Sequence, residues 1–260
     1  MQGKSTAPVF VRKMKVRVYP DRDRMGHAAA LYMRDLIREL SEKHAVINIV
    51  FAAAPSQNEF LDALSSLDGI PWERVQAFHL DEYIGLPPEA PQRFARYLDG
   101  RLFRRVPLKR VFYIDDGEGD TPEELCKRYS SLLEENPLHI ACIGIGENGH
   151  IAFNDPHVAD FDDPLRVKIV TLDRRSREQQ VADGCFSSLE EVPTQAITLT
   201  IPAIMAAQYI VCVVPGPRKA EAVKNTLDGP LSTACPASVL RCHRNVVLFL
   251  DRESARLLRR

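Results

Sequence analysis

Two groups of polar residues have the types and spacing that acid–base chemistry requires. The first is the carboxylate pair Asp81 and Glu82, which follows an apolar run and precedes a turn rich in glycine and proline. A carboxylate held beside a substrate can act as a general base. Adjacent side chains of an extended chain point in opposite directions, so we expect only one of the two to face a ligand. A surface turn with solvated acids is the competing interpretation.

The second group lies in residues 146–156, which read G-E-N-G-H-I-A-F-N-D-P. The imidazole of His150 can titrate near neutral pH. Asp155 follows five residues later and would orient that imidazole if the loop folds back, which fixes the tautomer and makes a better base. Gly146 and Gly149 permit a tight turn and a close approach of the backbone to a ligand. The alternative is a core histidine bonded to a backbone carbonyl.

Residues 144–149 also spell G-x-G-x-x-G, the pattern of a dinucleotide-binding turn. That pattern requires a following helix whose N-terminus holds a pyrophosphate. Here Asn154, Asp155 and Pro156 would stop such a helix within two turns. Asp173 could supply the later acidic residue, so a nicotinamide-dependent oxidoreductase stays open as a minor alternative.

Two weaker signals suggest an anion site, and a third set of residues raises the question of a metal. Ser56 follows three alanines before a predicted helix and could donate its hydroxyl. Lys219 lies in the first turn of another predicted helix, where a cation opposes the helix dipole unless it meets an anion such as phosphate. A solvated lysine is equally consistent with the sequence. The metal-ligand candidates match no zinc spacing, so we predict no metal site; they are His79, Asp81, His150, Asp155 and His157.

Short β-branched runs alternate with longer amphipathic stretches along the whole chain. This alternation predicts an α/β fold: a single Rossmann-like domain over residues 1–260, with a mostly parallel sheet and helices on both faces. Ligands of such sheets bind beyond the carboxyl ends of the strands, where both polar groups fall. The predicted strands are Val46–Phe51, Val75–His79, Val111–Ile114, Ile140–Ile145, Val167–Leu172, Tyr209–Val214 and Val246–Leu250. The predicted helices are Arg24–Lys43, Gln57–Leu67, Arg93–Phe103, Pro122–Glu135, Ile201–Ala207, Pro217–Leu227 and Glu253–Leu258.

Composition argues against several classes of protein. The 260 residues carry 34 basic and 35 acidic side chains, a net charge of −1, so we expect no general binding to nucleic acid or membrane surfaces. No run approaches the roughly 18 apolar residues of a membrane helix, and the N-terminus lacks the apolar core of a secretory signal. The six cysteines form no C-x-x-C pair, which favours reduced thiols and a cytoplasmic location. Basic residues near the two ends are interpreted as solvated tails, among them Lys15, Arg17, Arg256, Arg259 and Arg260.

Three segments, in this order, resemble the glucosamine-6-phosphate deaminase family, which shares a superfamily with 6-phosphogluconolactonase. Residues 78–87, F-H-L-D-E-Y-I-G-L-P, resemble the family's F-N-M-D-E-Y-V-G-L-P. Residues 146–156 resemble G-x-D-G-H-I-A-F-N-E-P, and residues 216–220 resemble G-x-x-K-A. The lactonase branch would read D-E-R and G-H-T-A-S, so Tyr83 and residues 151–154 favour the deaminase branch.

The resemblance implies a reaction and roles for the site residues. The family converts glucosamine 6-phosphate and water to fructose 6-phosphate and ammonia without a cofactor, and oligomers are common in it. Asp81 would move a proton between C2 and C1 of the opened sugar, and His150 would promote ring opening. Asp155 would orient His150, and Lys219 would contact the substrate phosphate. Asn148 completes the expected catalytic group, and the expected substrate-binding residues are Ser56, Glu82, Gly146, Gly149 and Lys219.

Several positions depart from the family pattern. Asn148 stands where the family has Asp, and Asp155 where it usually has Glu. The phosphate loop T-G-G-T-P aligns with residues 53–57, which have lost its glycines. Gln180 replaces an arginine, and Arg93 could restore a positive charge. These departures keep open a different amino-sugar phosphate, a lactone substrate, or a sugar-phosphate-binding protein without catalysis.

Overall fold

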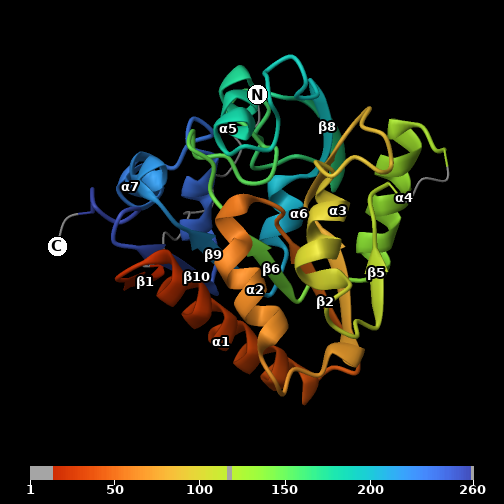
Figure 1. The fold of residues 1–260 in the computed structure, drawn as a ribbon, viewed down its shortest axis with the longest axis vertical. Helices are drawn as coiled ribbons and strands as arrows, with labels where there is room; N and C mark the ends of the chain where they lie inside the picture. The colour runs from red at the N-terminus through yellow and green to blue at the C-terminus, as the bar shows by residue number, and fades with distance from the viewer. Residues whose placement is uncertain (1–13, 116–118, 259–260) are drawn as a thin grey trace, which may run out of the picture.

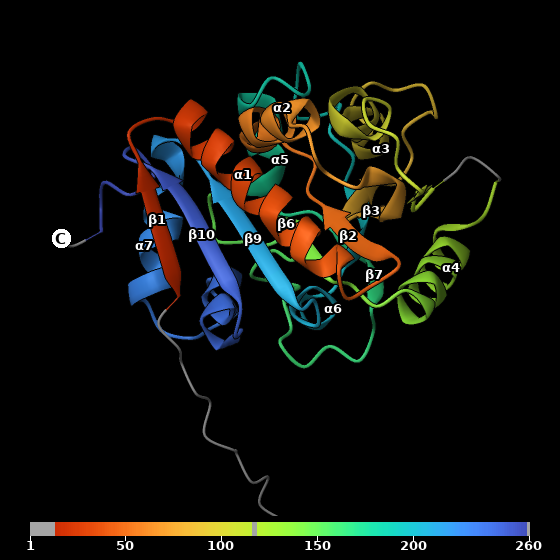
Figure 2. The ribbon, with the colours of Figure 1, turned by 90° about the horizontal axis from the view of Figure 1, so that it is seen from below.

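The computed structural model describes residues 14–115 and 119–258. Seven parallel strands form the main sheet, in the order β1-β10-β9-β6-β2-β3-β5 (Figures 1 and 2). Their bounds are β1 (Lys15–Tyr19), β2 (Ile47–Phe51), β3 (Val75–His79), β5 (Arg110–Phe112), β6 (Ile140–Ile143), β9 (Tyr209–Val214) and β10 (Val246–Asp251). The predicted α/β fold with a mostly parallel sheet is confirmed.

Helices cover both faces of this sheet, as the near-continuous apolar character of its strands requires. The strand β2 illustrates this, because Ile49 and Phe51 belong to one hydrophobic cluster and Val50 to the other. The first cluster includes residues of α1 (Arg22–Ser41), α2 (Asn58–Ser66), α3 (Phe94–Leu98) and the adjoining π-helical turn Asp99–Phe103. The second includes residues of α4 (Pro122–Glu135), α6 (Ile201–Met205), α7 (Ala220–Asp228) and the 3-10 helix Pro236–Cys242.

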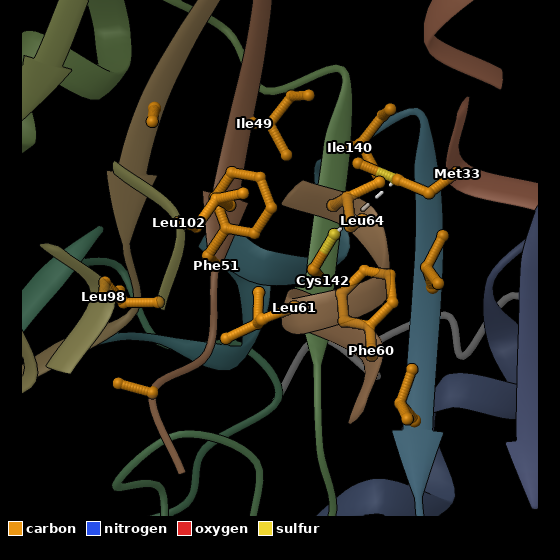
Figure 3. Packing of buried hydrophobic residues seen from close by; sticks show 14 of the residues in the cluster. Met33, Ile49, Phe51, Phe60, Leu61, Leu64, Leu98, Leu102, Ile140 and Cys142 are labelled. Atoms are coloured by element: carbon orange, nitrogen blue, oxygen red, sulfur yellow. Dashed lines mark hydrogen bonds between the residues drawn. The ribbon is translucent and has the colours of Figure 1, made fainter. Parts of the chain in front are cut away.

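The packing of α1 and α2 is tight at one point. Figure 3 shows Phe60, Leu61 and Leu64 of α2 beside Phe51 and Cys142 of the sheet. A Cβ atom at Gly26 of α1 would lie 2.7 Å from the backbone of Glu59, so only glycine permits this approach of the two helices. The two helices therefore pack closely against each other and against the sheet.

A second, three-stranded antiparallel sheet begins just after β3 of the main sheet. It contains β4 (Asp81–Tyr83), β8 (Gln195–Leu199) and β7 (Val167–Thr171), in that order. The helix α5 (Arg174–Ala182) follows β7 and lies in the upper part of Figure 1, as β8 does. The predicted strand Val167–Leu172 exists but belongs to this small sheet, where Val167 pairs with Leu199.

The structure corrects four other expectations. Lys15 and Arg17 are not a tail but part of β1, and Arg17 lies over the rings of Tyr32 and Phe249, at 5.0 and 5.5 Å from their centroids. The segment predicted as a helix at Glu253–Leu258 forms turns, and the predicted helix Arg93–Phe103 divides at Asp99. The elements β4, β8 and α5 were missed.

Arg259 and Arg260 lie outside the described residues. Within the described part of the chain, no helix combines the length and apolar character that crossing a membrane would need.

Candidate active site

A cleft opens where the main strands end at their carboxyl edge, the place that the fold predicts for a ligand site. Its volume is about 520 Å³, including its open mouth. Its walls come from the loops after β2, β3, β6 and β9 and from α5. Five of the predicted site residues line it: Ser56, Asp81, Gly146, His150 and Lys219. The other four, Glu82, Asn148, Gly149 and Asp155, do not line it.

The backbone of Asp81 is fixed by the buried side chain of His79. The Nδ1 atom of His79 lies 2.9 Å from the carbonyl oxygen of Asp81, and its Nε2 accepts the N–H of Ile114 at 2.9 Å. These partners assign the neutral Nδ1–H tautomer. Burial lowers the pKa of His79 to about 4, with a smaller lowering contribution from Arg93. His79 is therefore a structural support of the site.

The carboxylate of Asp81 faces the cleft without a protein partner. Its side chain is only 7% exposed, and no described residue donates a hydrogen bond to it. Burial, and then the charge of Glu82, raise the pKa of Asp81 well above its ordinary value. A carboxylate with a raised pKa and free lone pairs is suited to accept a proton from a ligand.

Glu82 points the other way, into the protein. Its oxygens accept the backbone N–H groups of Tyr83 at 2.9 Å, Phe94 at 3.1 Å and Ala95 at 3.0 Å. The guanidinium of Arg93 lies 3.7 Å away. Glu82 thus ties the start of α3 to β4. The structure does not bring it to the substrate cleft, in contrast to our expectation for this residue.

Arg93 also differs from what the sequence suggested. It is 4% exposed and forms a 2.7 Å ion pair with Asp115 besides its contact with Glu82. It lines a separate cavity and not the cleft. It therefore does not restore a positive charge to the cleft.

The loop after β6 folds back on itself and requires both of its glycines. The N–H of Gly146 donates to the carbonyl of His150 at 2.9 Å, and the N–H of Gly149 donates to the carbonyl of Gly146 at 3.0 Å. A Cβ at Gly146 would lie 2.2 Å from the His150 ring. Gly149 has φ +86°, and a Cβ there would lie 2.7 Å from Sγ of Cys235. A side chain at either glycine would therefore disturb the loop that carries His150.

The fold of this loop brings Asp155 against His150. The Nδ1 atom of His150 lies 3.0 Å from Oδ1 of Asp155, which is fully buried. Asp155 also accepts from Asn148 at 2.9 Å, from the hydroxyl of Ser176 at 2.5 Å and from the backbone N–H of Asp173 at 3.2 Å. Burial opposes its ionisation, but the hydrogen bonds and the charge of His150 outweigh it and lower the pKa of Asp155. Asp155 is thus an ionised partner for the histidine.

The side chain of Asn148 holds this loop through two hydrogen bonds. Its Oδ1 accepts the backbone N–H of His150 at 3.1 Å, while its Nδ2 donates to Asp155. Both ends of the amide are engaged, so its side chain orients the histidine and carboxylate and does not face the cleft.

Lys219 supplies a cationic side chain to the lining of the cleft. It is 7% exposed, and burial lowers its pKa to about 8, opposed by the charges of Asp183 and Glu147. No described residue forms an ion pair with it. Its neighbour Arg218 is already paired with Asp183 and Glu147. A buried ammonium without a counter-ion favours an anionic ligand.

Sequence reasoning missed several residues of the site. Gln57 and Gln179 line the cleft, as does Gln180, which had been considered only as a replaced arginine. Ser176 contacts both His150 and Asp155. Ser176, Gln179 and Gln180 lie on α5, whose sequence R-R-S-R-E-Q-Q-V-A lacks an apolar period, so the hydrophobic pattern did not indicate the helix. Only Asp173, which caps α5, gave a local sign of a helix start.

The structure does not support the dinucleotide alternative. Turns and an isolated bridge follow Gly149, where the fingerprint requires a helix. Asp173, the candidate ribose-binding acid, is the cap of α5 and lies 3.5 Å from Asn148. The described residues also contain no cluster of three or more histidine, cysteine or acidic side chains that could hold a metal ion.

The fold and cleft define an α/β protein equipped for proton transfer on a small anionic ligand, and the comparisons with known proteins agree. Residues 20–249 match the family described as glucosamine-6-phosphate isomerases/6-phosphogluconolactonase, and the chain belongs to this family. It is 42% identical over 184 residues to glucosamine-6-phosphate deaminase of Bacillus thuringiensis (strain Al Hakam), an alignment that covers 71% of this chain and 68% of the relative.

Solved structures show the same relationship. A monomeric glucosamine-6-phosphate deaminase superposes with a TM-score of 0.85 at 30% identity, covering 94% of this chain and all of that one. The 6-phosphogluconolactonase of Trypanosoma brucei superposes with a TM-score of 0.78 at 18% identity, covering 95% of this chain and all of that one. At that identity the second likeness shows the fold alone.

Proposed function

We propose that this protein is an amino-sugar-phosphate deaminase that converts glucosamine 6-phosphate and water to fructose 6-phosphate and ammonia. The observation that carries the proposal is the placement of Asp81 and His150 on one cleft, the first unpaired and the second bonded to Asp155. Isomerisation next to a carbonyl needs a carboxylate near two carbons, and ring opening needs a separate acid or base. The cleft supplies both.

His150 would open the sugar ring. Its Nδ1 is engaged by Asp155, so its Nε2 is left to exchange a proton with the C1 hydroxyl and the ring oxygen. Because Asp155 is ionised, it stabilises the imidazolium that forms while the proton is held. The product of this step is the open-chain aldehyde, with the amino group still on C2.

Asp81 would then carry out the isomerisation. Its carboxylate removes the proton from C2 and returns it to C1, while the O1 atom takes up a proton and the amino nitrogen gives one up. The aldehyde and amine thereby become an imine at C2 with a hydroxyl at C1. Water adds to the imine, and ammonia leaves to give the ketone. The raised pKa of Asp81 favours proton uptake from carbon, since a stronger base lowers that barrier.

Lys219 would hold the phosphate in the cleft, which the hydroxyl-bearing Ser56 also lines. Lys219 is the one cationic side chain among the described residues that line the cleft. A phosphate would therefore restore the lysine's charged form, which burial disfavours in the empty cleft.

Ammonia release from glucosamine 6-phosphate tests this proposal directly. We expect the wild-type protein to release ammonia and both Asp81→Asn and His150→Gln to lose most of the activity. Matched controls are Asp68→Asn and His157→Gln, which alter an exposed carboxylate and an exposed imidazole that do not line the cleft. An inert wild-type protein, or controls as impaired as the site variants, would contradict the assignment.

A lactone hydrolase is the second candidate, because an imidazole bonded to an ionised carboxylate could activate water without any help from Asp81. Hydrolysis of 6-phosphogluconolactone that survives in Asp81→Asn would favour it. Tight binding of sugar phosphates without turnover of either substrate would instead indicate a binding protein that has lost catalysis.

The location and assembly of the protein are further proposals. Six free cysteines fit a reducing compartment, and we propose that the protein acts in the cytoplasm. The resemblance suggests a homo-oligomer, whereas the structural relative at 30% identity is described as monomeric. Light scattering coupled to size exclusion distinguishes these two states.

A further inference from the structure

Ser176 lies buried between the two members of the His150–Asp155 pair. It occupies the first turn of α5 and is 3% exposed. Its Oγ is 2.5 Å from Oδ1 of Asp155 and 3.1 Å from Nδ1 of His150. A hydroxyl has one proton to donate and two lone pairs to accept with. Its two neighbours therefore determine how it is used.

Asp155 is ionised and can only accept, so the Ser176 hydroxyl must donate to it. The lone pairs of Ser176 then face Nδ1 of His150, which must carry the proton. The Nδ1–H group consequently has two acceptors on one side, the carboxylate of Asp155 at 3.0 Å and the hydroxyl of Ser176 at 3.1 Å. This arrangement disfavours the Nε2–H tautomer, which would place bare lone pairs against both oxygens.

We propose that Ser176 is a positioning residue for His150, one that fixes the Nδ1–H tautomer and the plane of the ring. The inference rests on the proposed function for its kinetic consequence, but its structural consequence holds in the free protein. With Nδ1–H committed to two acceptors, the Nε2 lone pair is directed to the substrate side of the ring. Ser176 does not line the cleft, so its effect on a ligand would pass through His150.

The position of Ser176 depends on the start of α5, which is fastened to the same carboxylate. The backbone N–H of Asp173, the cap of α5, donates to Oδ2 of Asp155 at 3.2 Å. Farther along α5, Gln179 accepts the N–H of Glu147 at 3.1 Å and lines the cleft. The helix α5 therefore contacts the loop after β6 in two ways: Ser176 supports His150, and Gln179 forms part of the cleft wall.

The test compares Ser176→Ala with Ser176→Thr, which keeps a hydroxyl. Ser254→Ala is the matched control, because Ser254 is also fully buried and hydrogen-bonded but pairs with Asp251 away from the cleft. Long-range ¹H–¹⁵N NMR of the substrate-free protein reports the His150 tautomer where the imidazole is neutral. Ammonia-release kinetics then separate kcat from KM.

We expect the wild type, Ser176→Thr and Ser254→Ala to show the Nδ1–H tautomer alone, and Ser176→Ala to show a mixture. Losing one hydrogen bond near a charge should lower kcat of Ser176→Ala about tenfold, with KM within about twofold. An unchanged tautomer in Ser176→Ala, or a mixture in Ser254→Ala, would overturn the proposal. If Ser176→Ala does not fold, Ser176→Cys, which has a weaker donor, carries the same comparison.

The two readouts keep this inference separate from the proposed function. If the wild type releases no ammonia but Ser176→Ala still loses the single tautomer, the positioning role stands and the deaminase assignment fails. If the wild type releases ammonia but Ser176→Ala keeps the single tautomer, the deaminase assignment stands and the positioning role of Ser176 fails.

Discussion

Two groups of charged residues at the cleft differ in how they are partnered: the His150–Asp155 pair, and the side chains of Asp81 and Lys219. On the side of the loop after β6, Asp155 accepts hydrogen bonds from His150, Asn148, Ser176 and the backbone of Asp173. By contrast, the carboxylate of Asp81 and the ammonium of Lys219 have no hydrogen-bond or ion-pair partner among the described residues. The carboxylate of Asp155 has its partners in the free protein, whereas Asp81 and Lys219 would gain partners only from a ligand.

The pKa shifts follow this difference. Partners lower the pKa of Asp155 despite its burial, whereas burial without partners raises the pKa of Asp81 and lowers that of Lys219. Unpartnered buried charges destabilise a fold, so their presence indicates selection for binding or catalysis rather than for stability. Substitutions in the two groups should therefore affect stability in opposite directions.

The largest expected effect is that of Asp81→Asn. Loss of the general base should lower kcat about a thousandfold, while removal of an unpaired buried charge should raise the free energy of unfolding by about 1 kcal/mol. Ammonia release and urea unfolding measure the two quantities. A variant that loses stability together with activity would contradict the view that Asp81 has no structural partner.

Asp155→Asn should instead lower both activity and stability. The amide keeps the shape of the side chain but has one acceptor oxygen and lacks the charge, so one or more of its donors loses its partner. We expect about a thirtyfold fall in kcat and a loss of about 2 kcal/mol in the free energy of unfolding. Stability equal to that of the wild type would contradict the proposed difference between the partnered Asp155 and the unpartnered Asp81.

Lys219→Met should weaken anion binding about tenfold while leaving kcat within about threefold of the wild type. Inhibition by inorganic phosphate measures the binding, and Lys224→Met, which changes an exposed lysine, is the control. In the wild type the ammonium is lost as pH rises through about 8, so KM should increase above that pH and not below it. A KM that does not change across this range would exclude Lys219 as the phosphate contact.

The last expected effect concerns stability alone and lies at His79, which holds the backbone of Asp81. Its folded pKa of about 4 lies below the ordinary value of 6.5, so the unfolded chain binds the proton more readily. The stability linked to its neutral form is complete above pH 6.5 and is lost as pH falls towards 4, by at most about 3 kcal/mol. His79→Gln should flatten this acid dependence of the urea midpoint, and an unaltered slope would argue against it.

Parts of the fold were predictable because their signals are local. The strand Tyr209–Val214 is a continuous apolar run, and Pro122–Glu135 has a proline at its first position and acids in its first turn. The edge strand β1 is largely exposed and basic, so its sequence resembles a tail, and only pairing with β10 makes it a strand. The helix α5 has no apolar stripe, and β4 consists of two acids and a tyrosine.

The sequence by itself determined which residues could carry acid–base chemistry and that they follow strands, because side-chain type and strand period are properties of neighbouring residues. Only the tertiary structure decided which of them act together. It turned Glu82 inward to the backbone of Phe94 and Ala95. It also placed Ser176 against His150 and Asp155, which lie 26 and 21 positions earlier in the chain. It also left Asp81 and Lys219 unpaired, because partnership depends on segments that meet only when the sheet has formed.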